Sequence, residues 1–319
     1  GKYTRKEINV LDLSLFTHHD TSKHYAALPF QTVTSLEGLP CNDIQKIYQS
    51  PDGYIWLASK NGFYRYDGYS FKTYKSNLYH PTLLSNNNIL CLEEDIENRL
   101  WIGTDKGLNV FSVKPENQAN QTLEFINNSI SALRSTRNGK LFIGTDQGLF
   151  CYDYNTDSCT LYNRQNTNGI FPETPVKSLL EDSHGHLWIG TWNQGLFRYD
   201  LAKNRFYAYP RMLPKSAHVI FEDSKKRIWI GTWGSGLYVL ENAYDPDNVR
   251  WKRSHMKTAM QKAFHMTLFT DTEDINSRNI WIGTSLGLSI LNDESKGTFT
   301  NFYPSEKDET ISDAEVTSL

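Results

Sequence analysis

The sequence has no apolar run long enough to cross a membrane and no marked excess of charge of either sign. A membrane span needs roughly 18–20 consecutive apolar residues, and the 319 residues contain no such run. The formal net charge is -3, and no block of like charges provides the basic face that a phosphate backbone requires. We therefore expect no nucleic acid to bind this chain and no part of it to span a membrane.

Motifs for catalysis and metal binding are equally scarce. None of the four cysteines shows CxxC spacing, which argues against a zinc site, and there is no glycine-rich phosphate loop or GxSxG elbow. His184 and His186 are two residues apart, a spacing that two metal ligands can have, but they stand in a predicted turn with no third ligand nearby. We expect no cofactor, no metal and no catalytic residue, although a glycosidase pair among the many carboxylates stays open.

What the chain does contain is an aromatic repeat. One motif, close to WIGT followed by a tight turn and GLFRYD, recurs six times at intervals of 41 to 52 residues. Its aromatic anchors are Trp56, Trp101, Phe142, Trp188, Trp229 and Trp281. Propeller blades have about this period, roughly 40–50 residues, and no segment shows a long apolar pattern at helical spacing. The repeat therefore predicts an all-β protein.

Each repeat has the pattern of four short strands. A single blade is apolar on both faces and can bury them only between neighbouring blades, so we predict a β-propeller of four-stranded antiparallel blades. The repeat units are approximately residues 30–74, 84–126, 127–162, 174–209, 216–251 and 264–303. Residues 1–29 and 304–319 resemble parts of one further unit, so we expect seven blades, with the seventh incomplete and shared by both termini. A cut inside a repeat also predicts that the chain is a fragment of a longer protein.

The segment that starts at Phe30 resembles the first repeat of the two-component regulator propeller family; it reads FQTVTSLEGLPCNDIQKIYQSPDGYIWLASKNGFYRYDGYSFKTY. The later units are similar, so the resemblance covers about residues 30–319. It implies the periplasmic sensor region of a membrane-bound hybrid histidine kinase of Bacteroidetes. In that family a second propeller and downstream domains follow, the full-length receptor is expected to be a homodimer, and many members respond to glycan fragments. Kinase activity would belong to parts outside this chain.

Two consecutive units carry an additional Trp in a turn that is one residue longer than in the other units. Trp192 and Trp233 are therefore expected side by side on one face of the ring, where flat aromatic faces suit sugar rings. Lys177 and His218 stand on the innermost strands of the same two units. The matching positions elsewhere are Gln45, Leu90, Ser131 and Met266.

These four residues are the candidate ligand site, with an oligosaccharide as the expected ligand. The alternatives are that the two Trp cover a loop or a second propeller, and that Lys177 and His218 are solvated channel residues. The leading functional hypothesis is a sensor propeller that binds an oligosaccharide or relays its binding. A carbohydrate-active propeller enzyme and a protein-interaction scaffold are the alternatives. Most carboxylates recur at the same place in each repeat, which predicts a role in turns.

The cysteines give one further expectation. Cys151 and Cys159 flank a predicted hairpin turn and could face each other across two strands. In an oxidising compartment they could form a disulfide, and two half-buried thiols are the alternative. Cys41 and Cys91 are expected to be unpaired.

Overall fold

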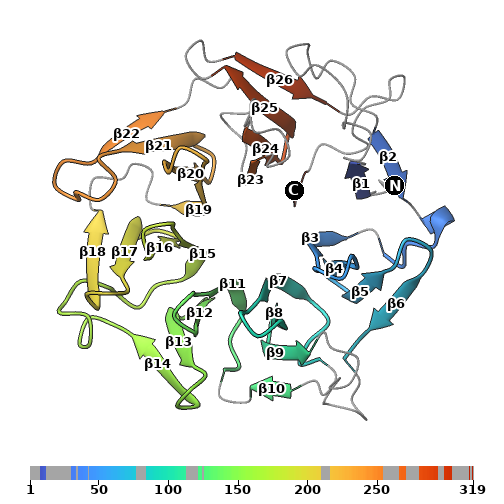
Figure 1. Cartoon of the computed structure of the whole chain (residues 1–319), viewed down its shortest axis with the longest axis horizontal. Helices are drawn as coiled ribbons and strands as arrows, with labels where there is room; N and C mark the ends of the chain where they lie inside the picture. The colour runs from blue at the N-terminus through green and yellow to red at the C-terminus, as the bar shows by residue number, and fades with distance from the viewer. Residues whose placement is uncertain are drawn as a thin grey trace.

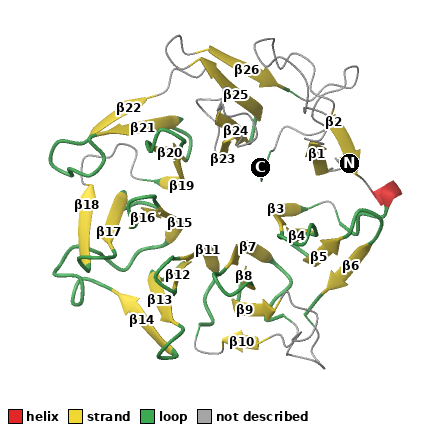
Figure 2. Cartoon of the chain, viewed as in Figure 1, coloured by secondary structure: helices red, strands yellow, loops and turns green. Residues whose placement is uncertain are grey.

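In the computed structural model the chain forms a ring of radial β-sheets around a central opening (Figure 1). The described residues are 8–11, 30–33, 35–41, 43–76, 84–112, 121–123, 126–209, 216–253, 266–270, 280–293, 298–303, 316 and 318. Apart from one 3-10 turn at Ser35–Glu37, the regular elements among them are strands (Figure 2). None of the described helical residues forms a segment long or apolar enough to cross a membrane. The prediction of an all-β propeller with antiparallel blades is confirmed.

Six sheets have four strands each, and we number these blades 1 to 6 in chain order. Blade 1 contains β3 (Ile44–Gln49), β4 (Ile55–Ser59), β5 (Gly62–Tyr66) and β6 (Phe71–Tyr74). Blade 2 contains β7 (Ile89–Glu94), β8 (Arg99–Thr104), β9 (Gly107–Ser112) and β10 (Gln121–Leu123). Blade 3 contains β11 (Ile130–Ser135), β12 (Lys140–Thr145), β13 (Leu149–Asp153) and β14 (Ser158–Tyr162).

The other three blades repeat this order from the centre outwards. Blade 4 contains β15 (Val176–Glu181), β16 (His186–Thr191), β17 (Leu196–Asp200) and β18 (Arg205–Tyr209). Blade 5 contains β19 (Ala217–Glu222), β20 (Ile228–Thr232), β21 (Leu237–Glu241) and β22 (Arg250–Arg253). Blade 6 contains β23 (Met266–Thr270), β24 (Ile280–Thr284), β25 (Gly287–Asp293) and β26 (Thr298–Phe302).

The repeated tryptophans pack between blades, as predicted. Trp188 of blade 4 is fully buried in a cluster with Ala217, Ile220 and Ile230 of blade 5. Trp229 of blade 5 packs in the same way against apolar residues of blade 6. Each apolar face therefore becomes part of a core only when the next blade covers it, which explains why the blades close into a ring.

The glycine of the repeated motif lies where the next blade comes closest. A Cβ atom added to Gly144 of blade 3 would stand 2.7 Å from Cγ1 of Val176 in blade 4. At Gly190 of blade 4, an added Cβ would stand 2.5 Å from the carbonyl oxygen of Ala217 in blade 5. The motif thus combines a large aromatic residue that fills the interface with a glycine that lets the backbones approach.

The repeated acidic residue before the second strand organises a turn, as the sequence indicated. Asp223 Oδ1 accepts hydrogen bonds of 2.9 Å from the backbone N–H groups of Lys225 and Arg227, and its Oδ2 accepts one of 2.8 Å from Trp229 Nε1. Asp95 and Asp182 do the same in blades 2 and 4. Each carboxylate thereby joins a turn to the buried Trp of its own blade.

The predicted total of seven blades, the seventh incomplete, is not what the described residues show. The described residues form six four-stranded blades rather than seven. Beside them, β1 (Ile8–Leu11) pairs with β2 (Phe30–Val33) in a two-stranded sheet that lies between blades 6 and 1 (Figure 1). Two hydrogen bonds join C-terminal residues to blades 6 and 1. The Val316 N–H donates to the Thr284 carbonyl of blade 6 at 2.9 Å, and the Ile47 N–H of blade 1 donates to Ser318 Oγ at 3.2 Å. The rest of the expected closing blade lies outside the described residues.

Of the two alternatives for Cys151 and Cys159, the structure shows two separate thiols and not a disulfide. Cys151 pairs in register with Thr160, and Cys159 pairs with Tyr152, so the two side chains point to opposite faces of the sheet. They accordingly pack into different hydrophobic clusters. All four cysteines are free thiols, as expected for Cys41 and Cys91.

Candidate functional site

The two long turns each begin at the threonine of the repeated motif. Thr191 Oγ1 donates a hydrogen bond of 2.7 Å to the Gly195 carbonyl, and Thr232 Oγ1 donates one of 2.6 Å to the Gly236 carbonyl. In the shorter turn of blade 2, Thr104 Oγ1 donates to the carbonyl of Gly107, three residues further along the chain. The additional residue therefore lengthens the turn without changing how it is closed, and it places a Trp directly after the threonine.

The structure brings the four predicted residues together. The ring centroids of Trp192 and Trp233 are 5.5 Å apart, and the His218 ring lies 5.3 Å from Trp192 and 5.0 Å from Trp233. Lys177 Nζ lies 5.5 Å from the centroid of the Trp192 ring. We call these four residues the Trp–His–Lys cluster. Lys177 and Trp192 belong to blade 4, and His218 and Trp233 belong to blade 5, so the cluster joins the two blades.

The two indoles are not buried in the core. Trp192 is 39% exposed and Trp233 is 43% exposed, whereas Trp56, Trp101, Trp188 and Trp229 are at most 2% exposed. The planes of Trp192 and Trp233 are inclined by 65°, so the two rings form a corner rather than one flat platform. Water-accessible aromatic surface of this kind is a common feature of ligand and partner sites.

A bulge in each innermost strand orients Lys177 and His218. The pairing of β15 with β16 shifts between Val176 and Ser178, and that of β19 with β20 shifts between Ala217 and Val219. Lys177 and His218 are the residues left between these pairs. A β-bulge redirects the side chain that it displaces and is frequent beside functional sites. The same shift occurs in blades 1 to 3, so the aromatic turns, and not the bulges, distinguish blades 4 and 5.

The residues at the matching positions of the other innermost strands are less suited to bind a ligand than Lys177 and His218. The Ser131 hydroxyl donates to the carbonyl of Val176 in the next blade, which is a structural role. Gln45 and Leu90 stand at the bulges of blades 1 and 2, whose turns after the second strand contain no additional Trp. Met266 begins β23, and its side chain is outside the described set. Blades 4 and 5 therefore remain the best-supported place for a site.

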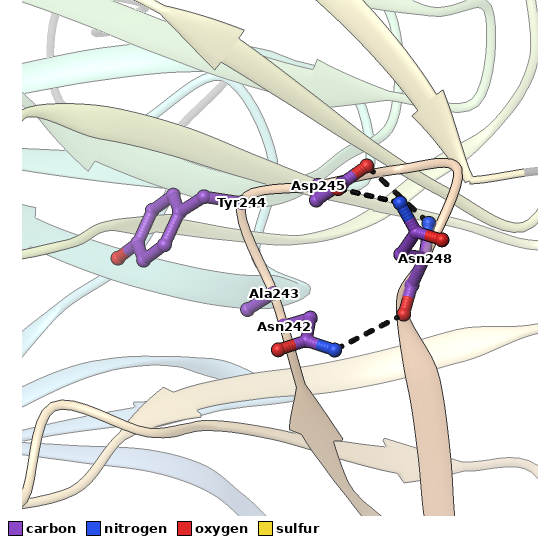
Figure 3. Close-up of a pocket in the computed structure, with 5 residues that line it drawn as sticks. All are labelled: Asn242, Ala243, Tyr244, Asp245 and Asn248. Carbon is purple, nitrogen blue, oxygen red and sulfur yellow. Dashed lines mark hydrogen bonds between the residues drawn. The ribbon is translucent and has the colours of Figure 1, made fainter.

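A separate cluster occupies the other face of the same two blades. Because consecutive strands of a blade are antiparallel, the turn between the first and second strands lies on one face of the ring and the turn between the second and third strands lies on the other face. Figure 3 shows the β21–β22 loop, which surrounds a pocket lined by Asn242, Ala243, Tyr244, Asp245 and Asn248. Within the loop, Asn248 Nδ2 donates to Asp245 Oδ2 at 2.8 Å, and Asn242 Nδ2 donates to the Asn248 carbonyl at 3.4 Å.

Tyr244 points out of this loop towards blade 4 (Figure 3). Its hydroxyl donates to Asp182 Oδ2 at 2.8 Å and lies 2.9 Å from His184 Nδ1. Arg198 Nη2 donates to the Tyr244 carbonyl at 3.1 Å, and Arg198 Nη1 lies 2.8 Å from His186 Nδ1. Burial, assisted by the nearby Asp182 carboxylate, raises the pKa of Tyr244 well above its usual value.

His184 and His186 thus belong to a contact between blades 4 and 5. Burial and the positive charge of Arg198 lower the pKa of His186 below its usual 6.5. In the part of the chain that the structure describes, no group of three or more His, Cys, Asp or Glu side chains could hold a metal. Arg198 and Tyr244 were not predicted from the sequence, whose one signal for them is the longer segment between the third and fourth strands of blade 5, NAYDPDN.

The radial four-stranded blades define the chain as a β-propeller. A protein-family model described as the two component regulator propeller matches residues 38–61, 83–106, 170–193 and 212–234. Four repeats of the chain therefore match this propeller repeat, which confirms the resemblance predicted from the sequence. The last two matches contain all four members of the Trp–His–Lys cluster. No curated protein matches the chain in sequence.

Solved structures show the same fold. The extracellular domain of one hybrid two component system from B. thetaiotaomicron aligns over 90% of this chain and 38% of its own length, with 22% identity and a TM-score of 0.71. Another from the same organism aligns over 86% of this chain and 35% of its own, with 21% identity and a TM-score of 0.70. The chain thus spans little more than a third of these extracellular domains.

An enzyme shares the architecture. Virginiamycin B lyase from Staphylococcus aureus aligns over 84% of this chain and 86% of its own, with 11% identity and a TM-score of 0.63. The fold alone therefore does not separate a sensor from an enzyme, and the function must be argued from the site.

Proposed function

We propose that the chain is an extracytoplasmic, periplasmic sensor propeller of a two-component regulator and that it binds an oligosaccharide at the Trp–His–Lys cluster. The observation that carries this proposal is the contact between two half-exposed indoles on adjacent blades, with a histidine ring touching both. The repeat supplies a core Trp in every blade except blade 3, but it supplies this second Trp only in blades 4 and 5.

The chemistry of the cluster suits a sugar. A pyranose ring has an apolar face of C–H groups that can cover an indole, and a rim of hydroxyls that seek hydrogen-bond partners. Two indoles inclined by 65° allow one sugar face to lie on one ring while the edge of the same or the next sugar contacts the other. By analogy with aromatic pairs, each ring contact contributes about 0.5–1.5 kcal/mol beyond area burial.

Two features of the whole receptor extend the proposal. We also propose that the two-stranded sheet β1–β2 and Val316 belong to one incomplete seventh blade; the packing of Val316 against the Trp281 cluster of blade 6 supports this. In the full-length receptor the propeller is proposed to be joined to a second propeller and downstream domains and to act within a homodimer, as the family resemblance implies. Ligand binding at the ring would then be relayed through those domains.

A glycan array tests the proposal. The 319-residue protein and its Trp192→Ala/Trp233→Ala variant are applied to an array of neutral and acidic plant, microbial and mammalian oligosaccharides. We expect the wild-type protein to bind a defined subset without cleaving it and the double variant to lose that binding with its fold intact. Tyr69→Ala is the matched control, because Tyr69 is 94% exposed on blade 1 and lies outside the cluster.

The array also separates the alternatives. Cleavage of a bound glycan would identify a carbohydrate-active enzyme. Absence of binding to any glycan would contradict the proposal and would favour a surface that covers a neighbouring domain. Equal binding by the wild-type protein and the double variant would place the sugar site elsewhere.

A further inference from the structure

The Trp–His–Lys cluster contains a positive charge that the protein leaves available. Lys177 is half-buried, and its Nζ lies 5.5 Å from the Trp192 centroid. Among the described residues no carboxylate lies within salt-bridge distance of this amine. Lys203 of the same blade, by contrast, has Asp200 Oδ2 at 3.9 Å. An ammonium group held beside an exposed indole without a carboxylate partner is suited to receive an anion.

The surrounding turns reinforce this charge. The aromatic turns of blades 4 and 5 read TWNQG and TWGSG and contain no acidic residue, whereas the matching turns of blades 2 and 3 contain Asp105 and Asp146. Glu173 is exposed in the loop that leads into β15. Among these turns the acidic residues therefore belong to blades 2 and 3, whereas Glu173 is the acidic residue nearest in sequence to Lys177.

We infer that the ligand of this site is an acidic oligosaccharide, with a carboxylate or sulfate on a pyranose ring that stacks on Trp192. This inference rests on the proposed function and adds the class of ligand. The oxyanion pairs with Lys177 while the sugar face covers the indole, so that one sugar residue uses both groups. Both carboxylate and sulfate are oxyanions of the kind that an ammonium binds as a point charge.

The test compares matched glycans and matched variants. The probes are tetragalacturonate, its methyl-esterified form, a sulfated galactan tetrasaccharide and its desulfated form, together with the full array. The variants are Lys177→Met, Lys177→Arg and Lys60→Met. Lys60 is the matched control, because it stands in the corresponding turn of blade 1, on the same face but outside the cluster.

We expect the array hits to be acidic glycans, with uronate or sulfate members showing which oxyanion is preferred. Lys177→Met should lower their affinity by roughly 10- to 100-fold, as for loss of a charge-assisted bond, and Lys177→Arg should retain most of it. Lys60→Met should leave it within about twofold, and the wild-type affinity should fall with added salt. Hits that are neutral, and equally bound by Lys177→Met, would overturn the inference and leave the proposed function standing. No hits at all would contradict both.

Quenching of tryptophan fluorescence tests the same charge without a glycan. Iodide is an anion and acrylamide is neutral, and the half-exposed Trp192 and Trp233 are accessible to both. At low ionic strength, Lys177→Met should reduce iodide quenching by about two- to threefold while acrylamide quenching stays unchanged. Equal iodide quenching of the wild-type protein and Lys177→Met would show that the amine provides no anion-attracting site and would overturn the inference.

Discussion

Trp188 donates a hydrogen bond of 2.7 Å from Nε1 to Oδ2 of Asp182, and both side chains are fully buried. The same pair recurs in blades 2 and 5 at 2.8 Å. Blade 3 has Phe142 in place of the Trp, and there Thr136 takes the place of the Asp. Blade 1 has Ser50 at this position, and there Trp56 Nε1 donates to Ser50 Oγ at 3.3 Å. Each of these four indoles therefore has an acceptor six residues before it, and in blades 2, 4 and 5 that acceptor is a carboxylate.

Loss of this carboxylate is expected to destabilise the protein. In Asp182→Ala the indole N–H of Trp188, two backbone N–H groups and the Tyr244 hydroxyl lose their acceptor. Buried donors without partners are costly, so we expect the free energy of unfolding to fall by about 3 kcal/mol, measured by urea denaturation. Thr136→Ala in blade 3 is the control, with an expected loss of about 1 kcal/mol.

The pairing of Asp182 with Trp188 is tested by introducing the corresponding two residues of blade 3, Thr and Phe, at these positions of blade 4. Asp182→Thr/Trp188→Phe should be more stable than Asp182→Thr alone, because the double variant has no buried indole N–H left to satisfy. A double variant whose stability equals the sum of the two single losses would show that the two residues act independently.

The close approach of blades 4 and 5 gives a second prediction. Gly190→Ala directs a Cβ against the Ala217 carbonyl and Ser178 Oγ, so we expect the free energy of unfolding to fall by about 2 kcal/mol through overpacking. The corresponding residue of blade 1 is Ala58, and Ala58→Gly should change it by no more than about 1 kcal/mol. Urea midpoints at a constant m-value measure both, and an unchanged midpoint for Gly190→Ala would contradict this packing.

His186 should make stability depend on pH. Its pKa is lowered by burial and by Arg198, so the unfolded chain binds the proton more readily than the folded one. The stabilising contribution is then complete above the unfolded pKa near 6.5 and is lost as pH falls through the folded pKa. Melting temperatures between pH 7.5 and 5 should fall less steeply in His186→Gln than in the wild-type protein. Parallel profiles would show that His186 does not titrate differently on folding.

The cysteines should behave as four separate thiols. Burial raises the pKa of Cys151 to about 11 and that of Cys159 to about 12, and the thiolate is the reactive form. Without a reductant, Ellman's reagent should therefore find four thiols in the denatured protein and only slow reaction of Cys151 and Cys159 in the native one. A count of two would contradict the observed register of β13 and β14.

The blades could be predicted from the sequence because the motif that indicates them is repeated. Trp, Gly and Thr recur at one place in the units, except for Phe142 in blade 3 and Ala58 and Ser59 in blade 1, and every copy contributes independent support for the same strand and turn. The sequence was also sufficient for the position of Trp192 and Trp233, since equivalent turns in adjacent blades must be neighbours. The exposure of both rings then followed from their place in a turn.

Features that depend on register or on single loops could not be predicted in this way. The turn between Cys151 and Cys159 was recognised, but the pairing offset that sends their side chains to opposite faces was not. Arg198 and Tyr244 meet only because the β21–β22 loop of one blade reaches the next. The extent of the closing blade depends on distant segments with no complete repeat pattern.

Isothermal titration calorimetry with a glycan selected by the array tests the central claim most directly. We expect Trp192→Ala and Trp233→Ala each to weaken binding by about 0.5–1.5 kcal/mol, and the double variant to lose measurable binding while its circular dichroism and melting temperature stay close to those of the wild-type protein. An unchanged affinity in the double variant would contradict the account, and the two indoles would then be surface covers rather than the sugar site.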